Sequence, residues 1–117
     1  MSVNLNLSLN VNEMEEYLID SYEDYILDKI GIHYIFRFPN NYGASVVKQY
    51  GCYGYENDKW ELACILFNHD EDMDGIPVVP TEYMIVYPPS LFIGRTPLGN
   101  LTDEEVYNIL KDIRSLK

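Results

Sequence analysis

Basic residues are scarce in this sequence. Eight lysines and arginines face 19 aspartates and glutamates, which gives a formal net charge of −11 at pH 7, and the few bases are scattered along the chain instead of forming a stripe. A field of this sign repels nucleic acid, anionic lipid and free nucleotides. The shortage of bases therefore argues against direct contact with nucleic acid or a membrane. An acidic surface suits a basic protein partner, or it serves solubility alone.

Cysteine and histidine are almost absent, with two residues of each. Two cysteines cannot build a disulfide framework or a zinc site made of thiolates. The opening residues lack the basic and apolar regions of a signal peptide, and no apolar run approaches the ~20 residues that span a membrane. No catalytic or cofactor motif stands out either. We therefore expect a cytoplasmic protein that is not an enzyme and holds no cofactor.

A β-hairpin is the element around which the rest of the chain can be arranged. Residues 32–38 alternate in the manner of a strand, residues 44–50 resume the alternation, and the stretch between them is rich in Pro, Asn and Gly. Residues 60–67 are mostly apolar on both faces, which is typical of a strand in the centre of a sheet. The pattern of residues 83–87 predicts a further strand.

Two segments carry the periodicity of amphipathic helices. The first covers residues 13–30 and follows Asn12 as its expected N-cap. The second covers residues 102–116 and opens with a capping box formed by Thr102 and Glu105.

This order of elements predicts a single α+β domain over residues 1–117. Its mostly antiparallel sheet of about four or five strands would be flanked by an N-terminal and a C-terminal helix. A strict alternation over residues 3–11 predicts an additional strand at the edge of the sheet. Because an exposed edge can pair with another chain, a homodimer could form through residues 3–11.

The first predicted helix is unusually acidic. In a helical projection, acidic residues and one leucine share the face opposite the apolar one. Like charges at helical spacing destabilise a helix by about 0.2–0.5 kcal/mol per pair, so this face is either a solvated surface or an acidic ridge for a basic partner. The expected partner-binding residues are Glu13, Glu16, Asp20, Glu23, Asp24 and Leu27, with Leu27 as the apolar anchor.

The sharpest local motif is an acidic turn. Residues 70–75 read D-E-D-M-D-G, which is how a calcium-binding loop opens, with Asp70, Asp72 and Asp74 as candidate ligands. The rest of the loop departs from that pattern, because its closing acid, Glu82, comes one residue late and two prolines interrupt it. We expect an acidic turn that binds no metal tightly. A calcium-dependent binding module is the alternative.

Three segments together resemble uncharacterised small proteins of bacteriophages and bacterial mobile elements. The shared pattern is F-R-F-P-N-x-Y-G-A-S-V-V, then W-E-L-A, then L-T-x-E-E-V, and it stands here at residues 36–47, 60–63 and 101–106. The resemblance covers roughly residues 17–117. It implies a phage or prophage origin and a location in the host bacterial cytoplasm, and it supplies no catalytic residues.

By analogy, this resemblance implies an inhibitor of a host defence protein. Such an inhibitor would bind stoichiometrically, as anti-CRISPR and anti-restriction proteins do, with an acidic face that mimics nucleic acid. An immunity protein or antitoxin that neutralises a basic toxin has the same electrostatics and is a further alternative.

Overall fold

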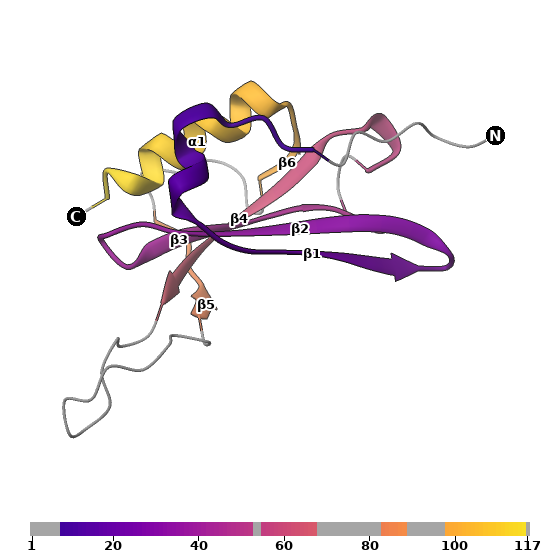
Figure 1. Ribbon diagram of the computed structural model, residues 1–117, viewed down its shortest axis with the longest axis horizontal. Coiled ribbons are helices and arrows are strands. Elements are labelled where there is room, and N and C mark those ends of the chain that lie inside the picture. The colour runs from indigo at the N-terminus through magenta and orange to yellow at the C-terminus, as the bar shows by residue number, and fades with distance from the viewer. Residues whose placement is uncertain (1–7, 53–54, 68–82, 89–97, 117) are drawn as a thin grey trace, which may run out of the picture.

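The computed structural model describes residues 8–52, 55–67, 83–88 and 98–116, which form an antiparallel sheet with one α-helix (Figure 1). The strands are hydrogen-bonded in the order β1-β2-β3-β4-β5, and β6 pairs with β4. This part of the chain is α+β, as the sequence predicts. Along the chain, the elements are the 3-10 helix η1 (Asn12–Tyr17), β1 (Leu18–Ile26), β2 (Lys29–Arg37), β3 (Tyr42–Lys48), the 3-10 helix η2 (Tyr55–Asn57), β4 (Trp60–Phe67), β5 (Tyr83–Ile85), β6 (Leu98–Leu101) and α1 (Asp103–Arg114).

The pairing of β2 with β3 confirms the predicted β-hairpin. Arg37 lies opposite Gly43 at the end of the ladder, and the backbone N–H of Phe38 donates to the carbonyl oxygen of Tyr42 at 2.8 Å. Glycine is required at position 43, because a Cβ there would collide with the carbonyl oxygen of Phe36.

Asn40 in this hairpin turn joins the sheet to the helix. Its Nδ2 donates to the carbonyl oxygens of Ile113, Arg114 and Leu116 at 2.9, 3.1 and 2.9 Å. Its Oδ1 accepts a hydrogen bond from the backbone N–H of Tyr42 at 3.0 Å. Because the last carbonyls of a helix have no partner within the helix, Asn40 satisfies this end of α1 and holds it over the turn.

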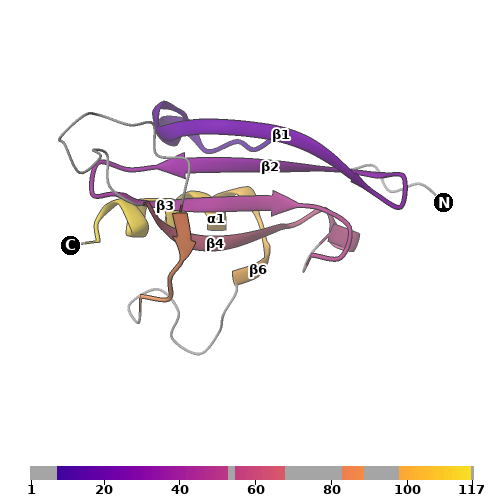
Figure 2. The same ribbon diagram turned by 90° about the horizontal axis from the view of Figure 1, so that it is seen from below.

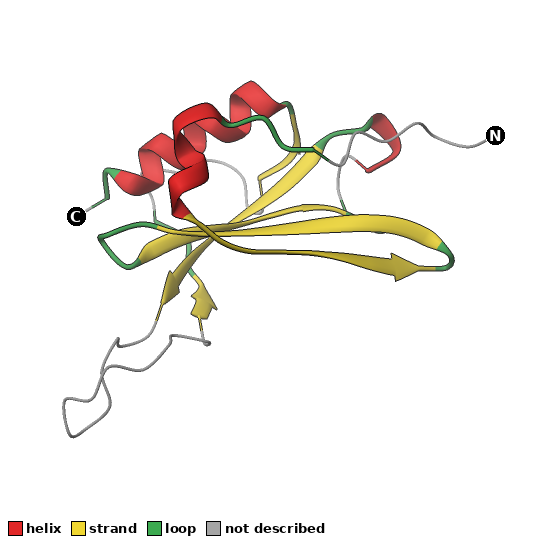
Figure 3. Ribbon diagram, in the orientation of Figure 1, coloured by secondary structure: helices red, strands yellow, loops and turns green. Residues whose placement is uncertain are grey.

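The helix α1 lies against one face of the sheet, which Figure 3 shows as a red coil above yellow strands. As predicted, β4 lies inside the sheet, where it pairs with β3, β5 and β6. The predicted capping box of α1 is present, with hydrogen bonds between Thr102 and Glu105 in both directions. The buried residues that β4 and α1 share in the core are Trp60, Leu62, Cys64, Val106, Leu110 and Ile113.

The predicted N-terminal helix over residues 13–30 is wrong. Its first residues form η1, which has no side-chain hydrogen bond at its N-cap position. The chain then continues as β1, turns at Leu27 and Asp28, and returns as β2. Two physical reasons favour the hairpin. The segment is rich in aromatic and β-branched residues, which fit a pleated strand, and its aspartates and serine are poor helix formers.

The predicted edge strand over residues 3–11 falls mostly outside the described residues. Residues 1–7 are not described, and residues 8–11 have no strand. Among the described strands, β1 is the edge on this side of the sheet (Figure 2). A homodimer through residues 3–11 stays a prediction. The short strand β6, at residues 98–101, was not predicted, because Gly99 and Asn100 are typical of a turn.

Candidate partner-binding site

The hairpin of β1 and β2 extends past the part of the sheet that α1 covers (Figure 1, Figure 2). Its turn consists of Leu27 and Asp28, whose φ angles are 51° and 62°. With Ile26 paired to Lys29 across it, this is a two-residue type I′ turn. A left-handed backbone costs a residue such as leucine about 1–2 kcal/mol. Leu27 is 73% exposed, so packing within the described chain does not offset that cost.

Large apolar side chains are exposed along β1 and its turn. In β1 only Leu18 is half-buried, and every following residue of the strand is exposed. Exposed apolar residues that cluster in this way mark contact sites more often than singly scattered ones do. The exposed large hydrophobic residues of this segment are Ile19, Tyr22, Tyr25, Ile26 and Leu27.

Carboxylates are interleaved with these apolar side chains. The register of β1 against β2 places Asp20 and Asp24 on the face away from α1, and Glu23 on the face toward α1. Glu13 and Glu16 come just before, in η1, and are exposed. The acids therefore do not form the helical ridge that the sequence predicts, because alternate residues of a strand point to opposite faces. They flank an exposed edge on both of its faces instead.

Tyr22 anchors the middle of β1 to the neighbouring strand. Its ring stacks on that of His33 with centroids 4.5 Å apart and planes 8° apart. Nε2 of His33 in turn shares a hydrogen bond of 2.8 Å with Oε1 of Gln49. Burial is the largest cause that raises the pKa of Tyr22, followed by the electrostatic effects of Tyr83, Asp20 and Asp24. Tyr22 therefore stays a neutral phenol near neutral pH.

The two cysteines are not placed as nucleophiles. Burial raises the pKa of the Cys52 thiol to about 11, and a hydrogen bond and the negative charge of Glu61 contribute. Burial also raises the pKa of Cys64 to about 11. Reactive thiols have a lowered pKa, because the thiolate is the nucleophile. Both thiols are therefore protonated at neutral pH.

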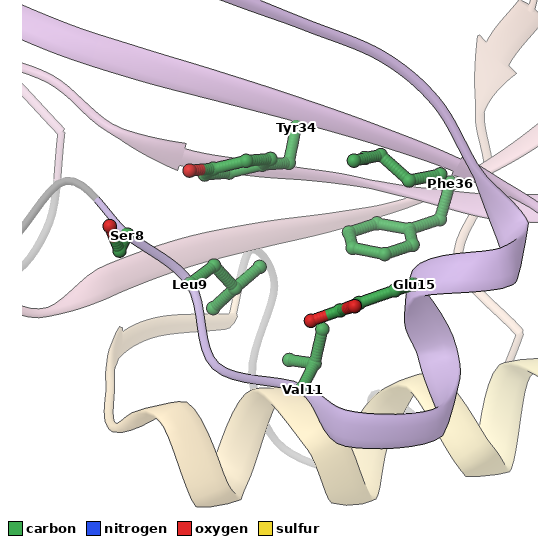
Figure 4. A pocket seen from close by; sticks show the side chains of 7 residues that line it. Ser8, Leu9, Val11, Glu15, Tyr34 and Phe36 are labelled. Carbon is green, nitrogen blue, oxygen red and sulfur yellow. The ribbon is translucent and has the colours of Figure 1, made fainter.

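A cavity of about 290 Å³ lies at the base of the hairpin, between the N-terminal segment and β2 (Figure 4). Leu9, Val11 and Phe36 supply apolar walls, and the carboxylate of Glu15 lies beside them. The volume is at the lower end of the range for ligand pockets, about 300–1,000 Å³, and it suits a single long side chain better than a cofactor. No pattern in the sequence indicates this cavity, because its two walls come from segments that only the fold brings together.

The metal-binding alternative is not tested by the described residues. Asp70, Asp72 and Asp74 lie outside them. Within the part of the chain that is described, no group of three histidine, cysteine, aspartate or glutamate residues is arranged to hold a metal ion. No helix in the same residues is long and apolar enough to cross a membrane.

Comparison with family models, with curated proteins and with solved structures finds no match to this chain. Roles for the hairpin residues therefore rest on their geometry and chemistry alone.

Proposed function

We propose that this protein acts by stoichiometric binding to a basic protein, and that the hairpin of β1 and β2 is its binding surface. The observation that carries the proposal is the exposure of β1 and its turn, where five large apolar side chains at positions 19–27 are interspersed with carboxylates. Protein interfaces are built in this way, from aromatic and aliphatic anchors within a polar rim. The carboxylates supply charge complementarity to a basic partner and speed the encounter.

Leu27 supports this use of the hairpin. A leucine at a left-handed turn position lowers the stability of the chain, and its side chain is exposed. Strained residues of this kind are found where function requires the side chain. Leu27 would be the apolar anchor at the tip, as the sequence suggests, and Asp20, Glu23 and Asp24 would surround it with Glu13 and Glu16 near the base.

The partner we propose is a nucleic-acid-binding defence protein of a host bacterium. The resemblance to phage and mobile-element proteins supports that origin, and the net charge of −11 supports a nucleic-acid groove as the target. A groove that holds phosphates with lysine and arginine side chains presents the charge that carboxylates can pair with. Binding there would block the nucleic acid and leave the host protein inactive, in the host cytoplasm.

The test compares two doubly substituted proteins with equal net charge. The hairpin variant, Asp20→Lys with Asp24→Lys, reverses charge on β1. The control variant, Glu56→Lys with Asp112→Lys, reverses two exposed acids in η2 and α1. Wild type and both variants are immobilised and exposed to lysate of the bacterial host at low salt, and the retained proteins are identified by mass spectrometry.

We expect one basic protein to be retained by wild type and by the control variant and to be lost with the hairpin variant. The purified partner should then release its bound nucleic acid when an equimolar amount of wild-type protein is added. Retention of the same proteins by both variants, or a partner that keeps its nucleic acid, would reject the proposal.

A further inference from the structure

The ladder between β1 and β2 determines which backbone groups of β1 point outward. A type I′ turn closes with a hydrogen-bonded pair, which here is Ile26 with Lys29. Hydrogen-bonded and non-hydrogen-bonded pairs then alternate along an antiparallel ladder. Ser21, Glu23 and Tyr25 fall at the non-hydrogen-bonded positions, so their N–H and C=O groups point away from β2. Among the described strands, none pairs with β1 on that side.

One of these outward donors is covered by a side chain of the same strand. The backbone N–H of Tyr25 donates to Oδ1 of Asp24 at 2.8 Å. A carboxylate that occupies an outward N–H protects an exposed edge against unwanted strand pairing. Because the bond is short-range and exposed, a cationic side chain that approaches Asp24 can draw the carboxylate away and free this N–H for another strand.

Pairing of this edge with a second copy of the chain is disfavoured by charge in the registers centred on Tyr22 and on Glu23. One symmetric antiparallel register pairs all of β1 with β1 of a second copy, and in it the two Tyr22 residues lie opposite each other. Asp20 of each copy then lies opposite Asp24 of the other. In the register centred on Glu23, the Glu23 residues of the two copies lie opposite each other. Like charges directly opposite on two strands are destabilising, and a net charge of −11 on each chain adds a general repulsion.

We propose that the outer edge of β1 accepts an extended, basic segment of the partner as an additional strand of the sheet. The inference rests on the proposed function and specifies its mode, which is strand addition. Backbone hydrogen bonds to Ser21, Glu23 and Tyr25 would hold the segment. Its lysine or arginine side chains would lie opposite Asp20 and Asp24, on the face away from α1, with an apolar residue between them against Tyr22.

The probe is a labelled peptide as long as β1, which has nine residues. It carries two lysines four positions apart, as Asp20 and Asp24 are, and valine or threonine elsewhere; the matched control peptide carries glutamates in place of the lysines. Binding to the full chain is measured by fluorescence anisotropy. We expect the lysine peptide to bind and the glutamate peptide not to bind, and failure of the lysine peptide to bind would overturn the inference.

Two substitutions at one position separate the backbone from the side chain. Ser21→Pro removes an outward N–H that takes no part in the ladder with β2, and proline is tolerated at such edge positions. Ser21→Thr keeps the N–H. We expect the proline variant to bind the lysine peptide at least about tenfold more weakly and the threonine variant to bind like wild type. Equal affinities would overturn strand addition, while the loss of the natural partner with the hairpin variant would still support the proposed function.

Amide hydrogen exchange gives a second readout that needs no substitution. Addition of the lysine peptide to wild type should slow exchange at Ser21, Glu23 and Tyr25 by at least about tenfold, with little change at Tyr22 and Asp24, whose N–H groups face β2. Unchanged exchange at all three outward positions would overturn the inference. Light scattering gives a further check. A wild-type dimer that dissociates in the Ser21→Pro variant would also overturn the inference, because the occupant of the edge would then be a second copy of the chain.

Discussion

The indole N–H of Trp60 donates a hydrogen bond to Oδ1 of Asp103 at 2.7 Å. Trp60 is almost fully buried at the start of β4, and Asp103 is the first residue of α1. The second carboxylate oxygen of Asp103 accepts from the backbone N–H of Asn10 at 3.3 Å. One carboxylate thus joins the central strand, the helix and the N-terminal segment that leads to β1.

Asp103→Ala should lower the free energy of unfolding by about 2–3 kcal/mol. The substitution leaves a buried indole N–H without an acceptor, which costs about 1–3 kcal/mol, and it removes a negative charge from the positive end of the α1 dipole. Asp103→Asn keeps the acceptor oxygen, so it should cost about 1 kcal/mol. Urea unfolding followed by tryptophan fluorescence measures both. Equal losses for the two variants would show that the hydrogen bond to Trp60 contributes little.

The fold could be predicted where local pattern and tertiary structure agree. The alternation at 32–38, 44–50 and 60–67 and the capping box of Thr102 and Glu105 each correspond to an element of the structure. The sequence predicts a helix over residues 18–26 because their apolar residues follow the helical period and do not alternate as in a half-buried strand. Leu18, Tyr22, Tyr25 and Ile26 fall on one helical face, although the segment forms a strand.

The turn of the β1–β2 hairpin was invisible in the sequence for a different reason. Leu27 and Asp28 lack the Asn-Gly or Gly-rich signature of a type I′ turn. Gly31, the residue that follows the predicted helix over 13–30, is instead a β2 residue where a Cβ would lie 2.8 Å from the carbonyl oxygen of Lys48. The sequence predicts the acidic residues and Leu27 as partner-binding residues, but their arrangement depends on a strand that the helical spacing of the apolar residues concealed.

Leu27→Asn should raise stability and lower affinity for the partner at the same time. Asparagine tolerates positive φ better than leucine does, so the free energy of unfolding should rise by about 0.5–1 kcal/mol. Loss of the exposed anchor should weaken binding by about 1–2 kcal/mol. Thermal unfolding of the free protein and titration calorimetry of the complex measure the two effects.

A matched control for Leu27 is Met84→Asn, which removes an exposed apolar side chain from β5 at the other edge of the sheet. Its affinity for the partner should equal that of wild type. If Leu27→Asn binds as tightly as Met84→Asn, Leu27 is not an anchor.

Cys52 should react slowly with iodoacetamide in the folded protein. With its thiol pKa raised to about 11, the thiolate fraction at pH 8 is on the order of a hundredfold lower than for a free cysteine. The rate should therefore rise as the pH approaches 11, and Glu61→Gln should increase it by removing the charge that helps to raise the pKa. Mass spectrometry of the modified peptide follows the reaction. A folded-state rate at pH 8 equal to the rate in urea would contradict the raised pKa.

The affinity of the purified complex between this protein and the captured partner is the most direct measure of whether the hairpin is the binding surface. Wild type, the hairpin variant and the control variant are compared by biolayer interferometry at several salt concentrations. The hairpin variant should bind at least about tenfold more weakly and the control variant within about threefold of wild type, with the association rate of wild type falling as salt rises. Equal weakening by the two variants, or no weakening by either, would contradict binding through the hairpin.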